Sequence, residues 1–383
     1  MLKPNSYFKI LFLLLLGSTF LFTACDNDDD GDEPAAFVLP SSYDAASFDA
    51  NSATEAGVRT QLSNLSSEMK KGRTGATVTK AALDGIYTGT LEAVTTDYYK
   101  GKLQGADKWL DELAAASGGA YDPAAVTGEG GVAGAYLLDE NGIEIEQLVE
   151  KGLFGAALYN HAVTLMKGDK TAATSDQILK IFGSHPDFPA SNNGDKHMNP
   201  DGFAATYAGR RTKGDDTNGL YFRIKNALIK LQAATSADPV FTTEKEEAIA
   251  ELQRAWEESQ MATVVNYCQA TITKLSASDY DNTDLTKIGS AMHSYSEGVG
   301  FLHGWRTIDP NYRVITDAQI DALLMKMKAP MNGTPTSYEF HRDPTPATLA
   351  PLQEVIDEIK MIYGFSDQQI EDFRLNFINE EDR

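Results

Sequence analysis

Cysteine and histidine are scarce in this chain. Its 383 residues include two cysteines, Cys25 and Cys268, and six histidines. Two cysteines so far apart supply no disulfide framework, so the fold must depend on its apolar core. Cys268 lies on an amphipathic segment, and we expect its thiol to be buried there as a small apolar group. The few histidines also make each one a conspicuous candidate for chemistry.

Positive charge is scarce as well. The 33 Lys and Arg residues face 55 Asp and Glu residues, which gives a formal net charge of −22. Nucleic acid is therefore excluded as a partner, because phosphate binding needs a cationic surface. The same acidity keeps the body of the protein away from anionic lipid.

Familiar catalytic motifs are missing from the sequence. It contains no HExxH, no GxSxG and no usable glycine-rich phosphate loop. Cys268 has no neighbouring histidine that would predict a nucleophile and base. We therefore expect a binding or interaction protein rather than an enzyme, and a peptidase is rejected as the main interpretation.

The N-terminus has the pattern of an export signal. Lys3 and Lys9 flank the beginning of an apolar run over residues 10–16, and Thr23-Ala24 precedes Cys25. Basic residues, a short apolar run and small residues before a cleavage point are typical of signal peptides. The cysteine in this place resembles a bacterial lipobox, which implies a signal peptide over residues 1–24 and a diacylated Cys25. The alternative is a plain secreted protein with an incidental cysteine.

A dense acidic block follows, with the sequence DNDDDGDEP after Cys25. Like charges repel one another and keep such a segment extended, so residues 25–40 are expected to act as a tether. The block resembles the export signal of surface lipoproteins in Bacteroidota. It implies a protein held at the outer membrane, on the cell surface, by the lipid on Cys25 alone.

The body, residues 41–383, is expected to be an all-α multi-helix bundle. Helical spacing of apolar residues runs through most of it, and no alternating pattern is long enough to build a sheet. A small hairpin is expected across Asn141-Gly142. Residues 184–218 have no sustained period and are expected to form a long irregular loop. One domain and two halves, residues 41–183 and 219–383, both remain open.

One helix of the second half is almost free of charge. From residue 288 to residue 305 the single formal charge is Glu297, and His293 stands four residues before it, on the same face. A helix without charge is usually central in a bundle, so Glu297 is expected to be buried. A buried carboxylate must be paired, protonated or bound to a cation. A stripe of Gly289, Gly300 and Gly304 would let another backbone come close.

The segment EQLVEKGLFGAALYNHA in the first half has a related pattern. Glu146 and Glu150 stand four residues apart before an uncharged run, and His161 follows three helical turns later. If the two helices pack together, these side chains join His293 and Glu297 around a site for iron, zinc or manganese. The alternative is a hydrogen-bonded His–Glu pair in the core and solvated acids at a helix start.

The irregular segment adds weaker candidates. Arg210 and Arg211 form a basic pair that could hold carboxylates, such as the propionates of haem. A cation could also find oxygen and nitrogen ligands in this segment. Its candidate ligands are His185, Asp187, Asp195, His197 and Asp201. An ordinary surface loop with Asn and Asp turns is the alternative.

The stretch GSAMHSYSEGVGFLHGW resembles the signature region of imelysin-like proteins. His293 corresponds to the histidine of that signature and Glu297 to its glutamate, four residues apart here rather than three. The whole chain resembles a family of Bacteroidota surface lipoproteins with an imelysin-like helical layout. The resemblance implies paired helical bundles in the cell envelope and a link to iron or haem uptake. Two functions follow as expectations: capture of a metal ion or metal-bearing ligand, and metal-free docking on an outer-membrane transporter.

Overall fold

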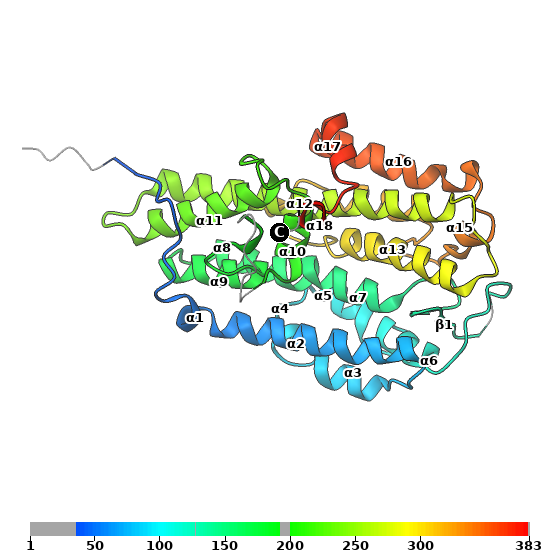
Figure 1. Ribbon diagram of the computed structural model, residues 1–383. Coiled ribbons are helices and arrows are strands. Elements are labelled where there is room, and N and C mark those ends of the chain that lie inside the picture. Colours follow the sequence, from blue (N-terminus) through cyan, green and yellow to red (C-terminus); the bar gives the residue numbers. More distant parts are fainter. Residues whose placement is uncertain (1–35, 127, 192–199, 382–383) are drawn as a thin grey trace, which may run out of the picture. The chain divides into compact units, whose positions relative to one another are not determined.

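The computed structural model describes residues 36–126, 128–191 and 200–381. The predicted signal peptide, Cys25 and most of the acidic tether lie outside these residues. In the part described, helices dominate and the one sheet has only two short strands, so the predicted all-α fold is confirmed (Figure 1). No helix of that part is long and apolar enough to cross a membrane.

The connections between the helices vary in length, and the longest lie between α6 and α7 and between α9 and α10. The α-helices are α1 (Phe48–Asn51), α2 (Ala53–Lys70), α3 (Lys80–Tyr87), α4 (Thr90–Val94), α5 (Asp97–Leu103), α6 (Trp109–Ala116), α7 (Ile145–Leu153), α8 (Asn160–Lys167), α9 (Ala172–Phe182), α10 (Phe203–Arg210), α11 (Leu220–Ser236), α12 (Thr242–Leu275), α13 (Leu285–His303), α14 (Asp317–Lys326), α15 (Tyr338–Arg342), α16 (Pro346–Tyr363), α17 (Asp367–Asp372) and α18 (Phe377–Glu380). Short 3₁₀ turns are η1 (Lys71–Thr74), η3 (Pro189–Ser191) and η4 (Pro310–Tyr312), and η2 (Phe154–Tyr159) is a π-helix.

Local signals in the sequence explain many of the helix ends. Side chains of Thr79, Thr96, Asp284 and Thr316 accept hydrogen bonds from backbone N–H groups in the first turn of α3, α5, α13 and α14. These bonds satisfy donors that a helix start would otherwise leave unpaired. Gly183 ends α9 with a φ of 112°, a conformation that glycine adopts without strain. Threonine and aspartate thus fix where these four helices begin.

Three long helices and the shorter α7 form the centre of the body. Figure 1 shows α2, α7, α13 and α12 lying alongside one another in that order, and α12 also packs against α11 and α16. Tyr159 joins these elements in the core, with its ring 5.2 Å from the ring of Trp256 and 4.4 Å from that of Trp305. The described residues from Phe37 onward form one compact unit.

Glycine lets α13 cross α7 with the two backbones in contact. A methyl group on Gly304 would lie 2.1 Å from the carbonyl oxygen of Gly152, and one on Gly300 would lie 2.5 Å from that of Gln147. Farther along α13, a methyl group on Gly289 would lie 2.2 Å from the carbonyl oxygen of Ala133. The small-residue stripe predicted from the sequence therefore does admit a neighbouring backbone.

The hairpin prediction is wrong in its position. The strands are β1 (Gly131–Ala133) and β2 (Tyr136–Leu138), which pair antiparallel with Val132 opposite Leu137. Asn141-Gly142 instead forms a turn before α7, because Asp139 accepts hydrogen bonds from the backbone N–H groups of Asn141 and Ile143. Residues 184–218 also contain one helix, α10, which the sequence pattern did not predict.

Candidate functional site

The α7–α13 crossing buries Glu297, as the sequence predicts. The residue is 6% exposed. Its Oε1 atom lies 3.6 Å from the Nζ atom of Lys151, and the hydroxyl of Tyr207 donates a hydrogen bond to it at 3.4 Å. The compensating positive charge for this buried carboxylate thus comes from a lysine on the facing helix.

His293 lies beside Glu297, and neighbouring side chains fix the orientation of its ring. Its Nδ1 atom is 2.5 Å from Oε2 of Glu144, and its ring stacks on Tyr136 with centroids 4.5 Å apart. Glu144 is fully buried, and its Oε1 atom lies 2.8 Å from Nη2 of Arg73. A carboxylate on one nitrogen of a histidine fixes the ring and directs the other nitrogen outward. That other atom, Nε2, lies 3.5 Å from Oε2 of Glu297.

Glu146 and Glu150 lie in the same cluster, each with its own cations. Arg73 Nε is 2.5 Å from Glu146, Lys151 Nζ is 3.0 Å from Glu150, and Lys70 lies near both. Burial and the neighbouring Glu144 raise the pKa of Glu146 to about 8. Burial alone would raise the pKa of Glu150, but Lys151 and Lys70 outweigh it and lower that pKa to about 2. Glu150 and Glu297 therefore share the single ammonium group of Lys151.

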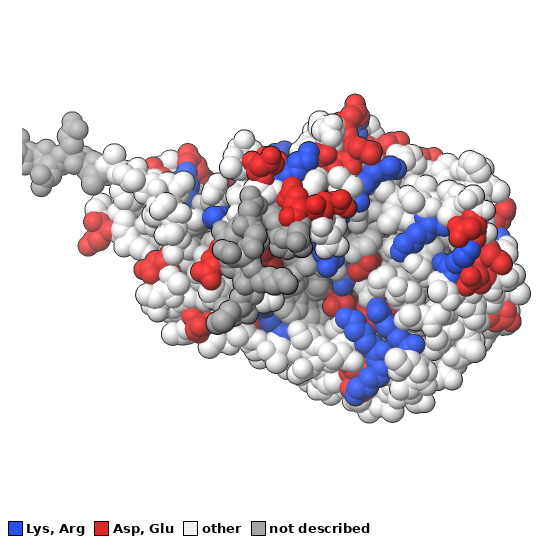
Figure 2. All heavy atoms as spheres, in the orientation of Figure 1, with Lys and Arg blue, Asp and Glu red and all other residues white. Residues whose placement is uncertain are grey.

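Positive side chains surround this cluster on the surface as well. Figure 2 shows Lys and Arg side chains gathered over α7 and the end of α2, beside a hollow with acidic side chains at its edge. Lys70 and Arg73 come from the end of α2 and from η1. Across the described residues, no group of three or more His, Cys, Asp or Glu side chains is arranged to hold a metal ion. Most of the acids here are balanced by Lys and Arg.

His161 lies apart from the other four predicted ligands. Its Nε2 atom is 2.9 Å from Oε1 of Glu55 on α2. The physical reason is the π-helix η2, which separates α7 from α8. A π-helical segment has wider turns than an α-helix, so the residues after it no longer share the face predicted from a regular repeat.

The two arginines of the irregular segment point to different environments. Arg211 is buried, its Nη1 donates to the carbonyl oxygen of Phe373 at 2.7 Å, and burial lowers its pKa to about 10. Arg210 instead lies over the ring of Tyr207, 4.9 Å from its centroid. Its guanidinium forms no ion pair with any residue that the structure describes. Arg210 is thus linked to Glu297 through Tyr207, whose hydroxyl donates to that carboxylate.

The other candidates of this segment have structural partners. Asp201 accepts hydrogen bonds from the backbone N–H of Ala190 at 3.0 Å and from the hydroxyl of Tyr221 at 2.7 Å. His185 Nδ1 lies 3.1 Å from Asp187, and Asp195 and His197 lie outside the described residues. Cys268 is buried as predicted, which raises the pKa of its thiol to about 12.

Sequence reasoning missed the residues that back the site. Glu144 precedes Glu146 in the stretch IEIE, and its position just before a helix was the only available signal. Lys151 directly follows Glu150 in the sequence, and nothing there indicates that its side chain also lies near Glu297. Arg73 comes from η1, and nothing in a single sequence links it to α7.

The geometry leaves one pair of atoms for a further partner. His293 Nε2 and Glu297 Oε2 are 3.5 Å apart and form no hydrogen bond with each other. Two ligand atoms of a tetrahedral metal ion, each about 2.1 Å from it, are about 3.4 Å apart. Behind this pair, Glu144 holds the histidine, and Lys151 and Tyr207 hold the far oxygen of the carboxylate.

Comparison of the chain with family models, curated proteins and solved structures found no match.

Proposed function

We propose that this chain is a lipid-anchored binding protein of the cell envelope that captures a metal-bearing ligand, such as haem or a ferric chelate. The observation that carries the proposal is the separation of 3.5 Å between His293 Nε2 and Glu297 Oε2. Both atoms are oriented by groups behind them, as is usual for metal ligands. A pair of ligands suits a metal that arrives with the rest of its coordination already filled.

The charges around the pair favour such a complex over a bare ion. Lys151 lies 3.6 Å from Glu297, so a free divalent cation would meet a positive charge close by. Arg210 has no carboxylate partner among the described residues, and it lies over Tyr207 next to the pair. A guanidinium is well suited to a carboxylate on a ligand. The metal and the acidic groups of one chelate would thus find complementary partners.

Titration of purified protein with haem, ferric citrate and Zn²⁺ tests the proposal. We expect haem or ferric citrate to bind with a change in absorbance, and Zn²⁺ to bind more weakly. His293→Ala and Glu297→Gln should each weaken binding at least about tenfold, a typical cost of disturbing a metal site. His161→Gln is the matched control, because His161 pairs with Glu55 away from the site.

Equal binding by all variants would contradict the proposed site. If neither haem nor ferric citrate binds to the protein, the metal function fails. The accessory role, docking on an outer-membrane transporter without metal, would then take its place, and co-purification with a membrane partner would support it.

The lipid anchor has its own test. Cys25→Ser should release the protein from the membrane fraction, because an acidic body has no other affinity for lipid. Fractionation of cells followed by a salt wash measures this. A variant that still sediments with washed membranes would contradict anchoring through Cys25.

A further inference from the structure

A cavity lies at the other face of α7, away from the His293–Glu297 pair. Its volume is about 190 Å³, and its walls come from α5, α6, α13, the turn before α7 and the loop after α14. A cavity of about 150 Å³ in another protein accommodates benzene, so this one has room for a molecule of roughly ten non-hydrogen atoms. Trp109 and apolar side chains such as Ile145, Leu148 and Val299 line it.

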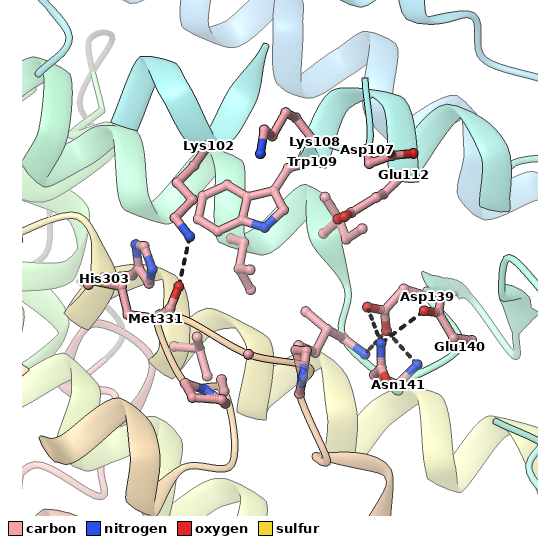
Figure 3. Close-up of a pocket in the computed structure, with 18 residues that line it drawn as sticks. Lys102, Asp107, Lys108, Trp109, Glu112, Asp139, Glu140, Asn141, His303 and Met331 are labelled. Carbon is pink, nitrogen blue, oxygen red and sulfur yellow. Dashed lines mark hydrogen bonds between the residues drawn. The ribbon is translucent and has the colours of Figure 1, made fainter. Parts of the chain in front are cut away.

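Charged groups of both signs line this cavity without pairing. Lys102 donates a hydrogen bond to the carbonyl oxygen of Met331 at 2.8 Å, which leaves its charge uncompensated. Lys108 and Glu112 form no ion pair or side-chain hydrogen bond within the described part of the chain. Figure 3 shows Lys102 on one side of the Trp109 indole and Glu112 on the other.

The carboxylate of Glu112 forms no ion pair with a described residue, although Lys108 and Lys102 act to lower its pKa. Burial, followed by the charge of Glu140, raises its pKa to about 7. Asp139, a second acid at the cavity, is already used by the backbone of Asn141 and Ile143. On the opposite side, burial and the charge of Lys108 lower the pKa of Lys102. Neither Glu112 nor Lys102 has a direct ion-pair partner among the described residues, so each would gain from a ligand group of opposite charge.

We propose that this cavity binds a small zwitterion of the size of a single amino acid. Its ammonium group would lie at Glu112, its carboxylate at Lys102 and Lys108, and its apolar part against Trp109 and the aliphatic wall. A purely anionic ligand would leave Glu112 without a partner, and a purely cationic ligand would leave both lysines without one. The cavity shares no residue with the proposed metal site, so the two proposals stand or fall separately.

Three probes of one shape separate the possible ligand charges. L-leucine carries both charges, 4-methylpentanoate lacks the ammonium group, and isopentylamine lacks the carboxylate. We expect leucine to raise the melting temperature and change the fluorescence of Trp109 at about 10 mM or below, a modest affinity for so small a ligand. The two analogues should bind about tenfold to hundredfold more weakly, because each lacks one charged hydrogen-bonding group.

Variants assign each charge to its side chain. Glu112→Gln should reduce leucine binding to the level of 4-methylpentanoate, and Lys102→Met with Lys108→Met should reduce it to the level of isopentylamine. Glu129→Gln, an exposed glutamate outside the cavity, is the control. Circular dichroism confirms that each variant is folded. Phenylalanine and 6-aminohexanoate, two zwitterions of other shapes, are tested beside leucine. The proposal is overturned if none of these three zwitterions binds to the wild type, or if an analogue with one charge binds as well as leucine.

Discussion

The two faces of α7 treat charge in opposite ways. On one face, Glu150 and Glu297 share Lys151, and Glu144 and Glu146 share Arg73. On the other face, Lys102, Lys108 and Glu112 line one cavity and form no ion pair in the described part of the chain. Both regions combine acids and bases beside an apolar core.

The difference separates charges that the fold requires from charges that are open to a ligand. A buried ion that compensates the charge of another is needed for stability, because removal of one partner leaves the other buried and uncompensated. Charges without partners contribute little to stability and remain available for binding. Substitutions on the two faces should therefore have very different costs.

The largest effect is expected for Lys151→Met, which would leave Glu150 and Glu297 buried without their shared cation. Loss of one member of a buried ion pair costs about 3–5 kcal/mol of unfolding free energy. Lys108→Met, on the cavity side, should change it by about 0.5 kcal/mol or less, as surface substitutions usually do. Urea denaturation measures both. Similar losses for the two variants would remove the contrast between the faces.

An intermediate effect is expected from pH, through His303 at the edge of the cavity. Burial, followed by the charges of Lys102 and Arg306, lowers its pKa to about 3. Below pH 6.5, the ordinary pKa of histidine, His303 is protonated in the unfolded chain but stays neutral in the folded chain. Above pH 6.5 the neutral His303 makes its full contribution to the free energy of unfolding. That contribution declines by about 1.4 kcal/mol per pH unit as the pH falls toward 3. His303→Gln should therefore lose less stability than the wild type between pH 6.5 and pH 4.5. Parallel curves would show that His303 is not the titrating group.

The smallest effect concerns the backbone contact that positions the paired face. In Gly300→Ala the new methyl group would meet the carbonyl oxygen of Gln147 at 2.5 Å, so α13 must shift. Overpacking of this kind costs about 1–3 kcal/mol. Gly57→Ala on α2 has no atom within 4 Å of the new methyl group and should be neutral or stabilising by about 0.4–1 kcal/mol. Thermal unfolding distinguishes them, and a tolerated Gly300→Ala would mean that α7 and α13 can separate slightly without loss.

Periodicity and composition predict the fold better than the site. The single formal charge between residues 288 and 305 predicts a central helix and a buried Glu297, because a helix almost without charge is usually buried. The pairing of Glu297 with Lys151 could not be predicted, since it depends on how two helices that lie far apart in the sequence cross. The π-helix η2 had no signal in the repeat, and it moved His161 to another face. Lys102, Lys108 and Glu112 converge only through the turns between α5 and α6.

The α7–α13 crossing also has a consequence for how quickly the protein can fold. The backbone N–H of Glu144 donates to Ser296, 152 positions along the chain, so this contact closes a very long loop. Contacts of such sequence separation form slowly, because the entropy of loop closure is lost before the contact can compensate it. While the chain is being synthesised, Glu144, Glu146 and Glu150 are present before α13 exists to cover them. We therefore expect the α7–α13 crossing to form late in folding. Limited proteolysis during refolding should cleave the first half of the chain at early times, and the fully folded protein should resist cleavage there.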